Sequence, residues 1–205
     1  IIAGLLTTDL SDAEVDAKIE QFNKMKFERV GLTLRPQMLA VKDVSGDAAR
    51  FAALAKAVVD KSDAALMLIS DKVEVLKAGL EAAKDRKPVL YAATPANADQ
   101  VGALAKEAGV PVVAKADGYD ALAELTTKLT GMGLKDIILD TGSRQIKEVL
   151  QDNIAIRRAA LTAQFKPLGF PVINLPCEMT DDPLKEALYA AIGIAKYAGI
   201  VVLKD

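Results

Sequence analysis

Residues 88–115 read PVLYAATPANADQVGALAKEAGVPVVAK, and this stretch decides the fold. Its two short apolar runs, Pro88–Ala92 and Pro111–Lys115, have the continuous hydrophobicity of parallel strands that are covered on both faces. Between them, Asn97–Ala108 has the pattern of an amphipathic helix. Gly109 follows this helix and can adopt the left-handed conformation that ends it. The stretch therefore predicts one β–α–β unit, and a proline opens each strand, where a missing N–H costs least.

The same alternation extends to both ends of the chain. The predicted strands are Ile1–Thr8, Met38–Asp43, Ala64–Ser70, Pro88–Ala92, Pro111–Lys115, Asp136–Asp140, Pro171–Leu175 and Gly199–Leu203. The predicted helices are Asp12–Met25, Asp47–Asp60, Lys72–Lys84, Asn97–Ala108, Tyr119–Gly131, Arg144–Gln164 and Pro183–Tyr197. A further extended piece, Val30–Leu34, precedes the second strand. From the second strand on, strand starts are 23 to 35 residues apart, which is the size of a right-handed βα unit.

Eight such strands favour a closed (β/α)8 TIM barrel over an open doubly wound sheet. We expect residues 1–205 to form this single barrel domain. A complete barrel usually needs about 250 residues. We therefore expect the domain to lack its eighth helix and the chain to be truncated at both ends. The predicted core includes one residue from each of six strands: Val41, Leu68, Leu90, Val113, Leu139 and Ile173.

Composition excludes several classes of protein. Lys and Arg number 26 against 28 Asp and Glu, and no basic block occurs, so nucleic acid is not an expected partner. The chain has no histidine, which excludes Ser–His–Asp, Cys–His and HExxH sites. Its one cysteine, Cys177, cannot by itself hold a cluster or a structural zinc, so no metal site is expected. No apolar run reaches the roughly 18 residues of a membrane span. We expect a cytoplasmic protein that does not bind membranes.

Polar residues gather where the predicted strands end, which is where these barrels carry their sites. Asp43 and Asp140 end strands, and buried carboxylates there could accept hydrogen bonds from the N–H groups of a heterocycle such as a pterin. The structural alternative is helix capping, because such loops are rich in Asp, Ser and Thr for that reason. Lys42 and Lys115 are candidates for Schiff-base formation, although lysines at strand ends more often pair with a nearby carboxylate.

Six stretches resemble a known family. They are residues 27–32, 41–47, 90–97, 138–142, 177–187 and 196–203, and the longest reads CEMTDDPLKEA at 177–187. In order and spacing over nearly the whole chain they resemble the large (gamma) subunit of the corrinoid/iron–sulfur protein of the reductive acetyl-CoA pathway, a component of the acetyl-CoA decarbonylase/synthase complex.

The resemblance implies a three-part protein with an N-terminal [4Fe–4S] domain, a central (β/α)8 barrel and a C-terminal corrinoid (cobalamin) domain. This chain covers the barrel alone, so no cofactor is expected within it. The implied function is to take a methyl group from methyltetrahydrofolate through a separate methyltransferase and to deliver it to acetyl-CoA synthase. The implied partners are the small (delta) subunit, that methyltransferase and CO dehydrogenase/acetyl-CoA synthase.

Three hypotheses for the barrel follow. The leading one is a scaffold and interaction surface without catalytic residues. The alternative is a pterin-binding TIM-barrel methyltransferase that binds the methyl donor directly. Because related barrels use strand-end Asp and Asn residues for the pterin, the candidate cofactor-binding residues are Asp43, Asn97 and Asp140. The third is a lyase that uses Lys42 or Lys115.

Overall fold

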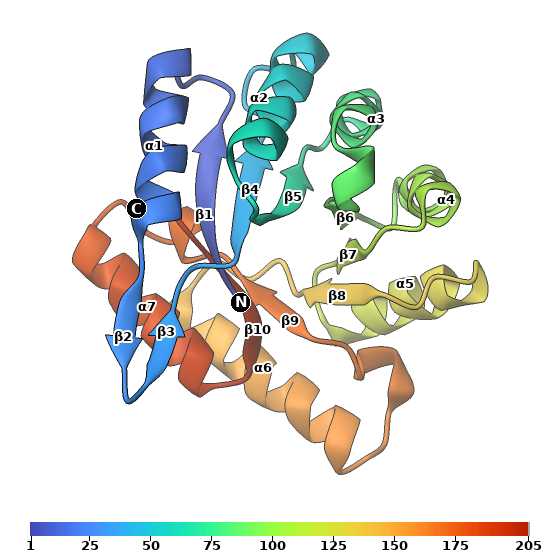
Figure 1. Cartoon of the computed structure of the whole chain (residues 1–205). Coiled ribbons are helices and arrows are strands. Elements are labelled where there is room, and N and C mark those ends of the chain that lie inside the picture. The colour runs from blue at the N-terminus through green and yellow to red at the C-terminus, as the bar shows by residue number, and fades with distance from the viewer. Residues whose placement is uncertain (205) are drawn as a thin grey trace.

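In a computed structural model that describes residues 1–204, eight parallel strands close into a barrel (Figure 1). In chain order these strands are β1 (Ile2–Thr7), β4 (Met38–Lys42), β5 (Ala65–Ile69), β6 (Val89–Ala93), β7 (Val112–Lys115), β8 (Ile137–Asp140), β9 (Val172–Asn174) and β10 (Ala198–Leu203). The helices are α1 (Asp12–Lys24), α2 (Ala48–Lys61), α3 (Val73–Ala82), α4 (Ala98–Ala108), α5 (Tyr119–Gly131), α6 (Ile146–Leu161) and α7 (Pro183–Ala195). Short 3-10 turns are η1 (Lys84–Arg86), η2 (Lys166–Leu168) and η3 (Pro176–Glu178).

The first strand closes the barrel. Ala3 of β1 is in register with Met38 of β4 on one side and with Val202 of β10 on the other. Both edges of the sheet are therefore paired, as closure of a barrel requires. The predicted (β/α)8 class is confirmed, and each predicted strand overlaps one strand of the barrel.

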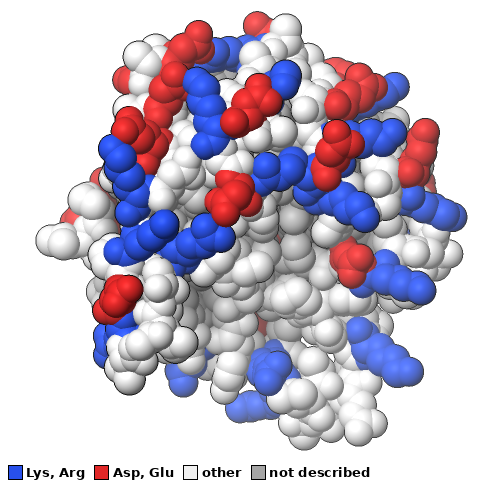
Figure 2. All heavy atoms as spheres, in the orientation of Figure 1, with Lys and Arg blue, Asp and Glu red and all other residues white. Residues whose placement is uncertain are grey.

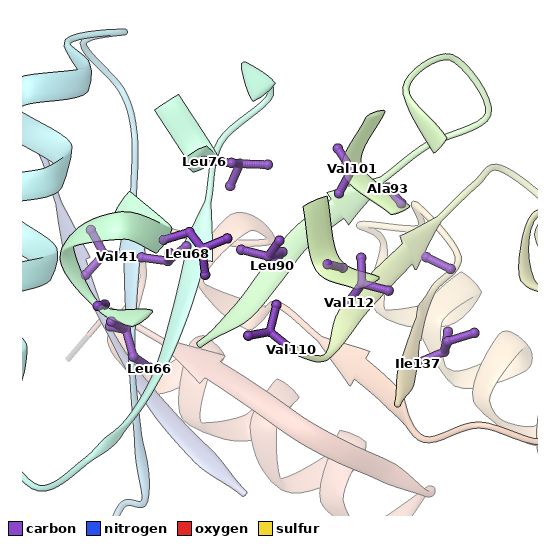
Figure 3. Close-up of a cluster of buried hydrophobic side chains, with 14 of the residues drawn as sticks. Val41, Leu66, Leu68, Leu76, Leu90, Ala93, Val101, Val110, Val112 and Ile137 are labelled. Carbon is purple, nitrogen blue, oxygen red and sulfur yellow. The ribbon is translucent and has the colours of Figure 1, made fainter. Parts of the chain in front are cut away.

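Alternation along the strands divides the core into two layers. Outward-facing residues such as Val41, Leu68 and Leu90 pack against the helices, as Figure 3 shows. Inward-facing residues such as Val113 and Ile173 fill the barrel itself. All six predicted core residues are buried, and none is more than 2% exposed. The continuous apolar runs thus arise because both faces of these strands are covered.

The segment before β4 differs from the prediction. Val30–Leu34 is not one extended piece, because Val30 and Gly31 have φ of 48° and 75° and form a turn. That turn joins β2 (Phe27–Arg29) to β3 (Leu32–Leu34) in an antiparallel hairpin outside the barrel (Figure 1). Every residue of both short strands is exposed, so the hairpin has no buried face to produce an alternating pattern.

The seam between β10 and β1 is the least covered part of the barrel wall. Among the described residues no α-helix follows β10, and a narrow apolar groove of about 90 Å³ runs along β1 beside α1. Leu184 and Leu188 of α7 are exposed at 82% and 56%. The outward side chains Leu6 and Val201 are nevertheless buried, because α1 packs against β1 and α7 packs against β10.

Acidic and basic side chains are interspersed over the upper part of the face drawn in Figure 2, whereas its lower centre is largely uncharged. Several exposed lysines of the chain pair with carboxylates, as in Lys56–Asp60 and Lys128–Asp99. None of the helices in residues 1–204 is long and apolar enough to span a bilayer.

Leu139 tests the two-layer core. Because Leu139 is fully buried between the strands and the helices, Leu139→Ala should lower the free energy of unfolding by about 2–5 kcal/mol through lost contacts and an unfilled cavity. Urea denaturation measures this. The matched control is Leu184→Ala, on the exposed face of α7, which should change stability little. Equal effects of the two variants would contradict this packing.

Candidate functional site

An ion pair between Asp140 and Arg144 lies at the carboxyl end of β8. Alternation turns Asp140 into the barrel, where it is 1% exposed. Arg144 Nη1 donates to Asp140 Oδ1 at 3.1 Å, and Nη2 donates to Oδ2 at 2.9 Å. The Tyr91 hydroxyl of β6 donates to the same Oδ2, and the Gly142 backbone N–H donates to Oδ1 at 2.9 Å. The carboxylate is thus surrounded by donors on both oxygens.

Glu178 extends this arrangement across the barrel. Its Oε2 accepts from Arg144 Nε at 2.6 Å, and its Oε1 accepts from Lys42 Nζ at 2.7 Å. We call Lys42, Tyr91, Asp140, Arg144 and Glu178 the mouth network. It ties the ends of β4 and β8 and the middle of β6 to the turn η3, so three strands and two loops are held in one polar cluster.

The network stabilises the ordinary charge states of its members. Burial, followed by the negative charge of Asp140, raises the pKa of Tyr91 above its usual range, so the phenol stays protonated. Burial alone would lower the pKa of Arg144, but hydrogen bonds and charge from Asp140 and then Glu178 outweigh it and raise that pKa. Burial alone would raise the pKa of Glu178, but Lys42 and Arg144 outweigh it and lower that pKa. None of these three groups is thereby poised for proton transfer near neutral pH.

Two of the three predicted pterin-type residues are used to hold their own loops. Asp43 Oδ1 accepts from the Gly46 backbone N–H at 2.7 Å, and Oδ2 accepts from the Ser70 hydroxyl at 2.9 Å. Asn97 Oδ1 accepts from the Thr94 backbone N–H at 2.7 Å, and Nδ2 donates to the Ala92 carbonyl at 3.3 Å. Of the three candidates, Asp140 alone belongs to the mouth network.

The other sequence candidates also have structural environments. Lys42 is ion-paired with Glu178, as expected for a lysine at a strand end, and Lys115 Nζ lies 5.7 Å from the centre of the Tyr91 ring. Cys177 is buried, and burial together with the charges of Glu178 and Glu186 raises the pKa of its thiol to about 12. Within residues 1–204, no group of three or more His, Cys, Asp or Glu side chains could hold a metal ion.

Sequence reasoning missed Arg144 and Glu178. Arg144 was expected to open a helix, but α6 begins at Ile146, so Arg144 lies in the preceding loop and turns toward the barrel. Glu178 is the last residue of η3, the short turn that comes after β9. The one available clue was the four-residue spacing between the strand-end Asp140 and Arg144, which allows an ion pair.

The fold and the polar strand ends define a class, the (β/α)8 barrels. A dihydropteroate synthase from Coxiella burnetii, solved with pteroic acid, matches with a TM-score of 0.69 and 11% identity, covering 100% of this chain and 87% of that one. The dihydropteroate synthase of Thermus thermophilus matches with a TM-score of 0.66 and 16% identity, at the same coverage of 100% and 87%. At these identities the likeness concerns the fold.

The sequence comparisons narrow the class to a family. A family model described as the CO dehydrogenase/acetyl-CoA synthase delta subunit matches residues 4–205, and the chain belongs to this family. The corrinoid/iron-sulfur protein large subunit of Moorella thermoacetica is 38% identical over 203 residues, which are 99% of this chain and 45% of that protein. Subunit gamma 1 of the acetyl-CoA decarbonylase/synthase complex of Methanosarcina thermophila is 35% identical over 95% of this chain and 45% of its own length. The chain thus spans just under half the length of these relatives.

Asp140 tests whether the mouth network is structural. Asp140→Ala leaves Arg144 and the Tyr91 hydroxyl without their common acceptor, which should lower the free energy of unfolding by about 3 kcal/mol. The control is Asp99→Ala, which breaks the exposed pair with Lys128 and should change stability little. Denaturant unfolding of both variants measures this, and an Asp140→Ala protein as stable as the control would contradict a structural role.

The lowered pKa of Glu178 predicts that the stability of the fold depends on pH. Its pKa is lowered from 4.5 in the folded protein, so below that pH the unfolded chain binds more protons than the folded one. The contribution of Glu178 to stability is therefore complete above pH 4.5 and is lost as the pH falls through its folded value. Unfolding of the wild type and Glu178→Gln should show a stability difference that shrinks below pH 4.5. A difference that grows on acidification would contradict the ion pairs with Lys42 and Arg144.

Proposed function

We propose that this chain is the barrel of a corrinoid/iron–sulfur methyl carrier and that the barrel acts as a scaffold and interaction surface. The named relatives support the carrier, since one is a corrinoid/iron-sulfur protein large subunit and others are gamma subunits of the acetyl-CoA decarbonylase/synthase complex. In this proposal the whole protein takes a methyl group from methyltetrahydrofolate through a methyltransferase and delivers it to acetyl-CoA synthase. Its partner is the small (delta) subunit.

The [4Fe–4S] cluster that the family name implies does not fit the residues of this chain. A cluster needs four thiolates, whereas the chain has Cys177 alone, and that thiol is buried and protonated. No residue here is assigned to the cluster or to the corrinoid. We therefore place both in the parts of the full-length protein that correspond to the remaining half of the relatives.

The mouth network is the observation that carries the scaffold proposal. A catalytic barrel exposes reactive groups at the carboxyl ends of its strands. Here Asp140 and Arg144 satisfy each other, Glu178 is held by Arg144 and Lys42, and the Tyr91 hydroxyl is held by Asp140. The pKa values of Tyr91, Arg144 and Glu178 are moved away from neutral pH, whereas proton transfer requires a pKa near it.

The second candidate remains a barrel that binds the pterin of the methyl donor directly. It is favoured by Asp140, a carboxylate that faces the inside of the mouth in a fold shared with dihydropteroate synthases. Binding a pterin there would require Asp140 to exchange the Arg144 and Tyr91 donors for those of the ligand. Such an exchange would leave the half-buried Arg144 without its main partner, which is costly.

The test uses the full-length protein in its complex. Asp43→Asn should leave the rate of corrinoid methylation by the methyltransferase unchanged, because one Asp43 oxygen holds its own loop and the other accepts from Ser70 after β5. Calorimetric titration of the complex with methyltetrahydrofolate, without methyltransferase, should show no saturable binding. The matched control is Asp71→Asn, at the exposed end of the neighbouring strand β5.

Two results would replace the scaffold by the pterin-binding alternative. One is saturable binding of methyltetrahydrofolate that Asp43→Asn or Asp140→Asn abolishes and Asp71→Asn does not. The other is loss of methylation in Asp43→Asn while subunit assembly and cofactor content stay normal.

A further inference from the structure

The carboxyl end of the barrel has two unlike halves. Around β6 and β8 it is filled by Tyr91, Asp140 and Arg144. Around the neighbouring strands β10, β1 and β4 it is hollow, with an open pocket of about 650 Å³. Glu178 lies between the halves, because it pairs with Arg144 on one side and with Lys42 on the other. The volume is in the range of sites that hold small molecules, about 300–1,000 Å³.

Three neighbouring strands each contribute a polar side chain to this pocket. Thr7 ends β1, Lys42 ends β4, and Lys204 follows the last residue of β10. The pocket also has an apolar part, formed by Leu5, Val44 and Met179 among others. A polar end with two cations beside an apolar wall is the arrangement expected for an amphiphilic ligand.

In this pocket the N–H donors of Lys42 and Lys204 have, on average, fewer partners than the carboxylate oxygens of Glu178. Both carboxylate oxygens of Glu178 already accept hydrogen bonds. An ammonium group carries three N–H donors, and Lys42 Nζ donates to Glu178. Lys204 Nζ pairs at 2.5 Å with Asp181, whose side chain is 98% exposed, and it also donates to the Thr180 carbonyl at 3.5 Å, which leaves one of its three N–H donors unused by these two partners. A surface ion pair of this kind adds little stability, so a ligand anion can replace Asp181 beside Lys204 at low cost.

We propose that this pocket binds a small molecule with an apolar body and one anionic group, a carboxylate or a phosphate ester. The anion lies between Lys42 and Lys204, and the apolar body packs against Leu5, Val44 and Met179. None of Asp43, Asn97 and Asp140 lines the pocket, so the site is separate from the pterin-type candidates.

The test uses the full-length protein with ¹³C-methyl-labelled methionine, and Met179→Leu assigns the Met179 signal. The probes are benzoate and phenyl phosphate, with benzyl alcohol as the neutral control of similar shape. The Met179 signal should shift saturably with one or both anions, and benzyl alcohol should bind about tenfold more weakly. The anion that binds more tightly distinguishes a carboxylate site from a phosphate-ester site.

Lysine variants locate the anion. Lys204→Gln and Lys42→Gln should each weaken binding about fivefold, since each removes a charge-assisted hydrogen bond. Lys204→Gln is the decisive variant, because Lys42→Gln also breaks the pair with Glu178. The matched control is Lys185→Gln, an exposed lysine near the start of α7 that does not line the pocket and should bind like the wild type.

Three outcomes would overturn the proposal: no saturable shift with either anion, equal affinity for benzyl alcohol, or unchanged affinity in Lys204→Gln. Any of them leaves the scaffold proposal intact, because corrinoid methylation in Asp43→Asn does not depend on this pocket.

Discussion

The ion pair between Arg144 and Asp140 organises the carboxyl end of this barrel. Asp140 is almost fully buried, and a buried carboxylate is tolerated only where donors replace its water. Arg144 provides two of these donors and uses its remaining Nε–H for Glu178, so one side chain joins β8 to the turn after β9. Glu178 also pairs with Lys42, so it lies between the filled half of the mouth and the open half.

In the proposed function, this arrangement accounts for the use of a fold shared with enzymes as a scaffold. The side chains of a catalytic barrel and of this one come from the same strand ends, but here their charges are paired with each other. The open half, around β10, β1 and β4, has Lys42 and Lys204 beside an apolar wall.

Much of the barrel was predictable because its physical cause is local. Strands covered on both faces must be apolar along their length, and βα units have a narrow range of sizes, so the eight strands and the six core residues followed from the sequence. The hairpin of β2 and β3 was not predictable in the same way, because both strands are exposed and have no apolar face.

The mouth network could be predicted only in part. The strand-end positions of Lys42 and Asp140 followed from the strand boundaries. The partners Arg144 and Glu178 lie in irregular loops, where no periodicity indicates the direction of a side chain. Asp43 and Asn97 were predicted as ligand-binding residues from their residue types. The same side-chain oxygens can also accept hydrogen bonds from backbone N–H groups, and in the structure they do so.

The most direct test of a structural, non-catalytic mouth is Tyr91→Phe in the full-length complex, because it removes one hydroxyl and keeps the ring. Two quantities are measured on the same preparation: the free energy of unfolding and the rate of corrinoid methylation by the methyltransferase. The network predicts a stability loss of about 1–2 kcal/mol from the hydrogen bond to Asp140, with an unchanged methylation rate. A lower methylation rate at unchanged stability would contradict it.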